Sequence, residues 1–329
     1  MKVSVCIPTY NQAQFVSQAV RSAFKQTVAP YEVIVSDDCS TDETYEVLTN
    51  LAKEVSDLKI VRQPFNLGIS GNTDYCLRLA TGDFVIRLDS DDYLSPNYVK
   101  KLGELLLQYP DAGYAHAAVQ EIDQEGKLLN KRILFRSSGF QSGIDALRSA
   151  KDGYRVAANI IMFRRSALVK VGYVTERPDY VEDYHLSAAL AAAGFGNIYL
   201  NETLSYYRVW VDAGNVRQRR KLMEIKGLQK VMDEILEPAY QQRGWDLTIL
   251  KKKRSAFACR QADCLAWDIY TAKEKAELME ALKTLSSSTS LKWFSWLYSN
   301  GFGDFLVFYS KCITFSKTCM KAFLISFKV

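Results

Sequence analysis

Several features that would assign the sequence to a common class of protein are absent. Its 329 residues include seven cysteines but no CxxC pair, and only two histidines, too few for a typical zinc site. No run of about 18 apolar residues forms a convincing membrane-spanning segment. Met1 leads directly into a strand-like segment, without the basic region and apolar core of a secretory signal. These absences favour free thiols in a reducing compartment and a cytoplasmic protein.

A large excess of one charge is also missing. The net charge is only +5, so the sequence does not require a nucleic acid partner and we expect none. With 48% hydrophobic and 24% charged residues, the chain is able to bury a full core. Its length fits one large domain with an appendage.

The first half of the chain alternates short apolar runs with helix-like stretches. The apolar runs predict strands at residues 3–7, 32–35, 58–61 and 84–88. Helices are predicted at residues 15–24, 44–51, 71–79 and 97–107. Because strands that alternate with helices pair in parallel, this pattern predicts an α/β fold with a mostly parallel sheet between helices.

The later part of the chain departs from this alternation. A hairpin is predicted from residues 114–122 and 128–134, which flank a turn-like segment. Further strands are predicted at residues 156–163, 197–200 and 204–209, with helices at 166–171 and 182–193. The pattern is then helical to about residue 285, and the serine-rich residues 286–290 are typical of a linker.

Three acids, Asp89, Asp91 and Asp92, directly follow an apolar strand. Like charges this close raise each other's pKa and cost stability unless a cation neutralises them. Carboxylate oxygens suit Mg²⁺ or Mn²⁺ that also binds a diphosphate, and open α/β sheets bind ligands at strand carboxyl ends. The alternative interpretation is a polar turn in which Asp92 caps the next helix.

A second acidic pair, Asp37 and Asp38, closes another strand. One acid of this segment is expected to cap the following helix, and another is able to accept hydrogen bonds from a base or a ribose. The GxGxxG fingerprint of dinucleotide-binding sheets is absent after the first strand, where residues 8–12 contain no glycine. A dehydrogenase is therefore disfavoured.

Two loops carry polar groups suited to a nucleotide. The Thr9 hydroxyl is able to meet a ribose or phosphate, and the Tyr10 ring is able to stack on a base. Residues 66–72 include two glycines and the amides of Asn66 and Asn72 ahead of a helix, so their backbone is able to approach a ligand closely. A helix-entry turn and an ordinary loop are the respective alternatives.

Glu182 and Asp183 precede an apolar helix far downstream. Such a pair is most often a favourable charge at a helix N-terminus. If the fold brings it opposite the acids at residues 89–92, one carboxylate is able to take the proton of an acceptor hydroxyl while that oxygen attacks an anomeric carbon. A metal would offset the charge on the leaving diphosphate.

The order of these segments resembles the inverting family 2 glycosyltransferases of the GT-A fold, specifically non-processive enzymes of bacterial polysaccharide biosynthesis. Residues 3–11 resemble the opening strand of that family, residues 33–42 its nucleoside-binding segment and residues 88–92 its DxD strand. The resemblance covers roughly residues 1–210. It implies a mixed, mostly parallel sheet flanked by helices, with a helical C-terminal extension.

The resemblance also implies a division of the chain. A GT-A catalytic domain is expected at residues 1–212, with a nucleotide-binding half at 1–112 and an acceptor half at 113–212. A helical extension at residues 213–285 and a basic aromatic tail at residues 286–329 would follow.

Residue roles follow from the same resemblance. Asp183, in a segment similar to the ED motif of the family, becomes the candidate catalytic base, with Glu182 as a second choice. Asp89 and Asp91 would hold the metal, Mn²⁺ or Mg²⁺. The expected nucleotide-binding residues are Pro8, Thr9, Tyr10, Asp38, Asn66, Asn72, Asp89 and Ser90.

The sequence departs from the processive members of that family. These usually carry a QxxRW motif and membrane-spanning helices, whereas here Gln218 is followed by Arg219 and Arg220 without the tryptophan, which favours single additions. From residue 291 the tail interleaves aromatic residues and lysines, with Asp304 as its one acid. Such a tail is able to lie peripherally on the inner membrane leaflet, or to pack on the catalytic domain or another subunit.

We therefore expect sugar transfer with inversion from a nucleotide diphosphate sugar, with a UDP-sugar as the expected donor. The acceptor is expected to be a hydroxyl of a glycan or a lipid-linked acceptor, in cell-surface polysaccharide or lipid-linked oligosaccharide synthesis. A nucleotidyltransferase is one alternative, but it would need a glycine-rich basic phosphate loop, which residues 9–11 do not supply. A non-catalytic glycan- or membrane-binding module is the other, and the joint presence of Asp38, Asp89, Asp91 and Asp183 argues against it.

Overall fold

The computed structural model describes residues 1–154, 156–174, 181–210 and 215–302. The chain forms two compact units, Met1–Val211 with Glu234–Ala239, and Asp212–Asp233 with Tyr240–Val329. Residues 234–239, which the sequence assigned to the helical extension, thus belong to the first unit. Of the expected basic aromatic tail, residues 303–329 lie outside the described residues.

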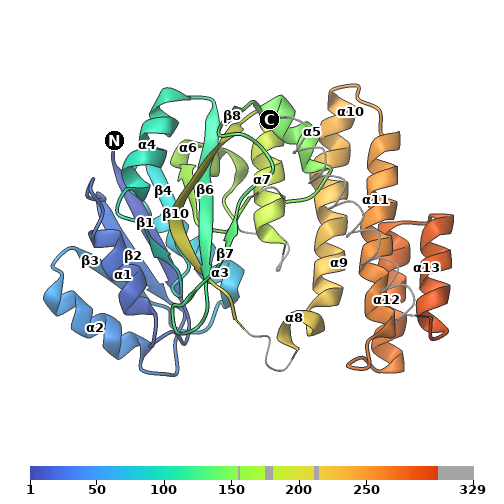
Figure 1. The fold of residues 1–329 in the computed structure, drawn as a ribbon, viewed down its shortest axis with the longest axis horizontal. Coiled ribbons are helices and arrows are strands. Elements are labelled where there is room, and N and C mark those ends of the chain that lie inside the picture. Colours follow the sequence, from blue (N-terminus) through green and yellow to red (C-terminus); the bar gives the residue numbers. More distant parts are fainter. Residues whose placement is uncertain (155, 175–180, 211–214, 303–329) are drawn as a thin grey trace. The chain divides into compact units, whose positions relative to one another are not determined.

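A mixed sheet forms the centre of the first unit (Figure 1). Four neighbouring strands run parallel, in the order β3 (Leu58–Arg62), β2 (Glu32–Asp37), β1 (Val3–Thr9) and β4 (Phe84–Arg87). Next come β9 (Ile161–Arg164), antiparallel to both neighbours, then the parallel pair β6 (Ala112–Ile122) and β10 (Gly196–Arg208), and β5 (Tyr93–Leu94). Off this path, β7 (Leu128–Arg132) pairs with β6 and β8 (Gly139–Gln141) with β10.

Helices cover both faces of this sheet. Because side chains alternate along a strand, Val5 and Ile7 join one apolar cluster while Cys6 joins the other. The first cluster includes residues of α1 (Val16–Phe24), α2 (Thr44–Glu54) and α4 (Tyr98–Gln108). The second includes residues of α3 (Gly68–Leu79), α6 (Arg165–Val171) and α7 (Glu182–Ala192), and α5 (Gly143–Ala150) packs on α7. The predicted α/β fold is confirmed.

Two sequence predictions in this unit were wrong in detail. Residues 197–200 and 204–209 do not form separate strands, because β10 continues through Asn201 and Glu202. The pairing of β10 with β6 shifts in register at this point, as at a β-bulge. Of the strand predicted at residues 156–163, only the end is a strand, since β9 begins at Ile161.

The second unit is helical in its described part. Its helices include α8 (Val216–Arg219), α9 (Lys221–Lys230), α11 (Thr248–Gln261), α12 (Ala272–Leu285) and α13 (Thr289–Ser299), and α10 (Glu237–Gln242) lies across the boundary. Of the predicted linker at residues 286–290, residues 286–288 connect α12 to α13, whereas Thr289 and Ser290 already belong to α13. The helix starts this early because the Ser288 hydroxyl accepts a hydrogen bond from the Leu291 N–H and caps it. No helix in the described part of the chain has the length and apolar character to span a bilayer.

Candidate active site

The parallel strands deliver the predicted site residues to one edge of the sheet. β1 ends at Thr9, β2 at Asp37 and β4 at Arg87, and these ends are neighbours because the three strands pair in parallel. Loops that follow such ends are where open α/β sheets bind ligands. Asp38, Tyr10 and the acids at residues 89–92 therefore lie on one rim.

Asp38 shapes a loop at this rim. Its carboxylate is buried and accepts hydrogen bonds from the Leu67 N–H, at 2.7 Å, and from the Gly68 N–H, at 3.0 Å. Burial raises the pKa of Asp38 and the nearby Asp37 charge adds to this, while the two N–H groups act in the opposite direction. Both oxygens are thus engaged by the backbone, and the role of Asp38 in holding a base stays a prediction.

The two predicted asparagines also bind the protein itself. The Asn66 side-chain amide donates to the Asp38 carbonyl at 3.2 Å. Asn72 is buried, accepts from the Ser36 hydroxyl at 2.6 Å, and donates to the carbonyls of Ser36 at 2.9 Å and Thr9 at 3.4 Å. Asn72 therefore ties α3 to the ends of β1 and β2, and its contact with a nucleotide stays a prediction.

Two other predicted nucleotide-binding residues, Thr9 and Tyr10, present groups that are available to a ligand. Thr9 is buried, and its hydroxyl has no hydrogen-bond partner among the described residues. Tyr10 is 44% exposed, so its ring is open to stacking. Pro8 is half-buried and Ser90 is buried. A buried hydroxyl without a hydrogen-bond partner destabilises the fold unless a ligand or water bonds to it. The Thr9 hydroxyl is therefore a suitable contact for a bound ligand.

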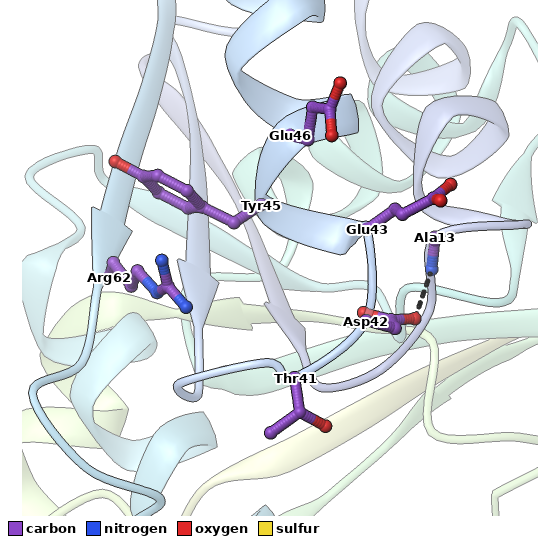
Figure 2. Close-up of a pocket in the computed structure, with 7 residues that line it drawn as sticks. All are labelled: Ala13, Thr41, Asp42, Glu43, Tyr45, Glu46 and Arg62. Carbon is purple, nitrogen blue, oxygen red and sulfur yellow. Dashed lines mark hydrogen bonds between the residues drawn. The ribbon is translucent and has the colours of Figure 1, made fainter.

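A separate open pocket of about 690 Å³ lies beside α2 (Figure 2). Figure 2 shows Tyr45 and Arg62 side by side on its wall, with the guanidinium 4.5 Å from the ring centroid. The other lining residues are Ala13, Thr41, Asp42, Glu43 and Glu46. None of the predicted site residues lines it, and its three acids disfavour a diphosphate. Asp42 accepts from the Thr44 N–H at 2.9 Å, but it precedes the N-cap residue of α2, Glu43, whose side chain makes no capping hydrogen bond.

The acidic turn after β4 is crowded with carboxylates. Burial first, and then the charge of Asp89, raise the pKa of Asp91. Burial and the charge of Asp91 raise the pKa of Asp92 still further. One oxygen of Asp92 accepts from the Arg208 N–H at 2.7 Å, and the other is buried without a partner among the described residues. The alternative that Asp92 caps the next helix was wrong, because α4 starts only at Tyr98.

These carboxylates fit a hard divalent cation. Asp89 and Asp91 would hold it, in a turn where burial and neighbouring carboxylates raise the pKa of Asp91 and Asp92, and where one oxygen of Asp92 is buried without a hydrogen-bond partner among the described residues. In the part of the chain that the structure describes, no three acids, histidines or cysteines converge as a complete ligand set. A cation there would take its other ligands from a diphosphate and water, as Mg²⁺ commonly does.

Arg87 joins the acidic turn to the distant pair on α7. Its Nε lies 3.1 Å from Asp89 Oδ1, and its Nη1 lies 2.5 Å from Asp183 Oδ1 and 3.9 Å from Glu182 Oε1. The side chain is 5% exposed. Burial lowers the pKa of Arg87, but the charges of Asp183, Asp89 and Glu182 outweigh this and raise it overall. Arg87 therefore stays charged among three acids.

The two acids of α7 have different electrostatic environments. Burial and then the Asp183 charge raise the pKa of Glu182 to about 7. Burial first, and also the Asp89 charge, raise the pKa of Asp183, although the adjacent Arg87 opposes this by charge and by hydrogen bonding. Of the two acids, Asp183 lies closer to the guanidinium, which favours its ionised form. That form is the one able to accept a proton.

The comparisons with known proteins decide the family. The model of "Glycosyl transferase family 2" matches residues 4–172. The chain belongs to glycosyl transferase family 2. This confirms the resemblance drawn from residues 3–11, 33–42 and 88–92.

Curated relatives in this family match part of their own length. The chain is 36% identical over 129 residues to the GalNAc(5)-diNAcBac-PP-undecaprenol beta-1,3-glucosyltransferase of Campylobacter jejuni, covering 39% of this chain and 40% of that protein. It is 30% identical over 169 residues to the poly(ribitol-phosphate) beta-N-acetylglucosaminyltransferase TarS of Staphylococcus aureus, covering 47% of this chain and 29% of that protein. The matches thus span well under half the length of these relatives.

Two solved structures share the fold. A crystal structure of TarS residues 1–349 aligns with a TM-score of 0.65 at 18% identity, over 87% of this chain and 80% of that one. The mannosyltransferase PcManGT of Pyrobaculum calidifontis, solved with GDP-Man and Mn²⁺, aligns with a TM-score of 0.55 at 18% identity, over 91% and 84%. At such identities the likeness confirms the GT-A fold alone.

Three residues of this family 2 site had no role in the sequence predictions. Arg87 stood in the apolar strand beside the acidic turn, and a lone arginine there gives no sign of its partners. Arg208 and Trp210 stood at a strand end, where a basic and an aromatic residue are common. Apart from the contact of Arg87 with the nearby Asp89, their roles depend on residues at least 84 positions away in the chain. Arg208 contacts the Asp123 and Gln124 carbonyls, Arg87 contacts Glu182 and Asp183, and Trp210 contacts Asp91.

Proposed function

We propose that the chain transfers a sugar from a nucleotide diphosphate sugar to a hydroxyl acceptor, with inversion at the anomeric carbon. One observation carries the proposal: Asp183 of α7 and Asp89 of the turn after β4 meet on the same buried guanidinium of Arg87. Single displacement needs a base on the acceptor side and charge stabilisation on the leaving-group side. In the proposal, Asp183 supplies the base, and Asp89 holds the cation that stabilises the leaving group.

Asp183 acts as the base in this proposal. Its carboxylate takes the acceptor hydroxyl proton while that oxygen forms the new bond to the anomeric carbon, and the bond from that carbon to the diphosphate oxygen breaks. Attack from the face opposite the leaving group inverts the configuration. Asp89 and Asp91 hold Mn²⁺ or Mg²⁺, which when bound supplies the positive charge that stabilises the leaving diphosphate.

The donor is proposed to be a UDP-sugar, bound by the rim residues. TarS structures with UDP and with UDP-GlcNAc support this choice at the level of the shared fold. In the proposal, Asp38 with Pro8, Thr9 and Tyr10 forms the nucleoside pocket, and Asn66, Asn72, Asp89 and Ser90 lie around the ribose and diphosphate. The nucleotidyltransferase alternative is disfavoured, because β1 ends without a glycine-rich basic loop.

A ligand screen tests the donor site. Purified protein is heated with UDP, GDP, CDP or TDP, each with Mn²⁺ or with EDTA, and the unfolding midpoint is recorded. Since a ligand at 100 times its dissociation constant adds about 2.7 kcal/mol of stability, we expect UDP with Mn²⁺ to raise the midpoint by several degrees. A shift with another diphosphate would reassign the base. No shift with any would favour the glycan- or membrane-binding module.

The acceptor is proposed to be a glycan of a cell-surface polysaccharide or a lipid-linked oligosaccharide, reached by a cytoplasmic enzyme lying peripherally on the inner membrane. The name of the Campylobacter relative, which includes an undecaprenol-linked diphosphate glycan, supports a lipid-linked acceptor. By sequence, the second unit carries 20 Lys and Arg against 10 Asp and Glu, a net +10, although the chain totals +5. A unit this basic is attracted to anionic lipid headgroups.

Helix α13 presents the surface suited to that membrane. One side of the helix is buried through Leu291 and Tyr298, whereas Trp293 and Trp296 are 63% and 56% exposed and Phe302 beyond them is 48% exposed. The indole centroids are 6.3 Å apart, and Trp296 lies 6.1 Å from Phe302. We name Trp293, Trp296 and Phe302 the aromatic face. Exposed tryptophans on a basic unit are typical of proteins that lie in the headgroup layer.

Vesicle binding tests the aromatic face. The full chain is sedimented with phosphatidylcholine vesicles that contain or lack phosphatidylglycerol, without donor or acceptor. The W293A/W296A variant is expected to bind the anionic vesicles about tenfold more weakly, because it loses roughly 1.4 kcal/mol or more of apolar transfer. F135A is the matched control, since Phe135 is 88% exposed in the first unit. Equal binding of W293A/W296A and wild type would remove the aromatic face from membrane contact.

A further inference from the structure

The end of β10 is fastened to the acidic turn by Arg208. This side chain is 3% exposed, and its Nε donates to the Asp91 carbonyl at 2.9 Å. Its Nη1 donates to the carbonyls of Asp123 and Gln124, each at 2.8 Å. A buried arginine with this many acceptors has one conformation, so the backbone beyond it leaves the sheet in a defined direction.

Trp210 follows two residues later and reaches the Asp91 carboxylate. Its indole N–H donates to Asp91 Oδ2 at 2.5 Å. Its ring packs edge-on against Phe15, with the centroids 5.3 Å apart and the planes at 87°. The ring is thus anchored at one side by Phe15, and its single polar group is used on Asp91.

The two oxygens of Asp91 therefore differ. Oδ2 accepts from Trp210, whereas no hydrogen bond from another described residue reaches Oδ1. An indole N–H is a donor only and is not a metal ligand, so it orients the carboxylate without competing for the cation. Hydrogen bonds to a ligating carboxylate fix its orientation, and their loss commonly weakens metal binding 10- to 100-fold.

We propose that Trp210 is a positioning residue that holds Asp91 Oδ2 and thereby presents Oδ1 to the divalent cation of the donor complex. The inference rests on the proposed function, because it assumes that Asp91 is a metal ligand. It assigns a role to a residue outside the acidic turn, two positions beyond the end of β10. In this proposal, Trp210 does not contact the base or the ribose of the donor.

The test measures Mn²⁺ binding directly, from the electron paramagnetic resonance signal of free Mn²⁺ at constant UDP. W210F keeps an aromatic ring against Phe15 but removes the N–H, and we expect the Mn²⁺ dissociation constant to rise about tenfold. UDP binding in EDTA is expected to be unchanged. W296F is the matched control, because it makes the same substitution at an indole of α13 that is 56% exposed. D91A is expected to lose Mn²⁺ binding.

The outcomes separate this inference from the proposed function. Wild-type Mn²⁺ affinity in W210F overturns the inference alone. Normal affinity in W210F with weak affinity in W210A also overturns it, because the ring packing rather than the N–H would then matter. If the wild-type protein binds no Mn²⁺ with UDP, the metal site of the proposed function fails, and the role of Trp210 fails with it.

Discussion

Replacing Asp183 with asparagine is expected to lower kcat by about 10²- to 10⁴-fold, the usual contribution of a general base. The amide has nearly the same shape but cannot accept the acceptor proton. Arg87 keeps its contact with Asp89, so the donor side should be undisturbed. Transfer is followed with the radiolabelled sugar donor, and UDP with Mn²⁺ is expected to stabilise D183N as it does wild type. Loss of that stabilisation would instead give Asp183 a donor-side or structural role.

Glu182 supplies the matched control for this variant, because it is adjacent and also buried. E182Q is expected to retain far more transfer than D183N, and the reverse order would assign the base to Glu182. Its raised pKa of about 7, against an ordinary 4.5, means that the folded protein binds this proton more tightly than the unfolded chain. Stability is therefore expected to fall as pH rises from about 4.5 to 7, and E182Q should flatten that slope in denaturant titrations.

Much of the sheet and its rim was predictable from local sequence. The runs at residues 3–7, 32–35 and 84–88 are almost uninterrupted apolar segments, as expected for parallel strands covered on both faces. Their carboxyl ends are marked by abrupt polar residues, which placed Thr9, Asp38 and Asp89 on one edge. Whether a segment forms a buried parallel strand, and where that strand ends, depend on local residues, so both can be predicted from composition and spacing.

Other features depended on contacts between distant residues. Separate strands were predicted at residues 197–200 and 204–209, but β10 runs through Asn201 and Glu202 because β6 pairs with both flanks. The serines at residues 286–290 predicted a linker, although the same hydroxyl chemistry that favours loops also caps α13. A short-range pattern cannot choose between such outcomes when packing against another element decides them.

The same limit explains the candidate site. The acids could be found because like charges in a row are unusual. Arg87, which neutralises part of their charge, is 96 positions from its partner Asp183, so the local sequence does not indicate this ion pair. Asp38 and Asn72 were assigned to a ligand, and in the structure the Asp38 oxygens accept from backbone N–H groups while the Asn72 oxygen accepts from the Ser36 hydroxyl. A polar side chain at a strand end serves a ligand or a loop by the same chemistry, and only the surrounding N–H groups distinguish the two.

Replacing Arg87 with glutamine is expected to damage both stability and transfer. It leaves Asp89, Asp183 and Glu182 near one another without a cation, and breaking a buried ion pair from one side costs about 3–5 kcal/mol. The deficit in unfolding free energy should be largest at neutral and higher pH. It should shrink in acid, because protonated carboxyls no longer repel one another. Denaturant titrations of both proteins across pH measure this.

A second variant and a control separate charge from geometry. R87K restores a positive charge but not the planar fork whose Nε and Nη1 reach two different acids, so it should recover stability more than transfer. R21Q is the control, because Arg21 and Glu54 form an exposed pair at 2.6 Å whose loss should cost at most about 1 kcal/mol. Full transfer activity in R87K would mean that the charge alone suffices. A pH-independent deficit in R87Q would mean that Arg87 acts by packing, and the three acids would then need another explanation for their coexistence.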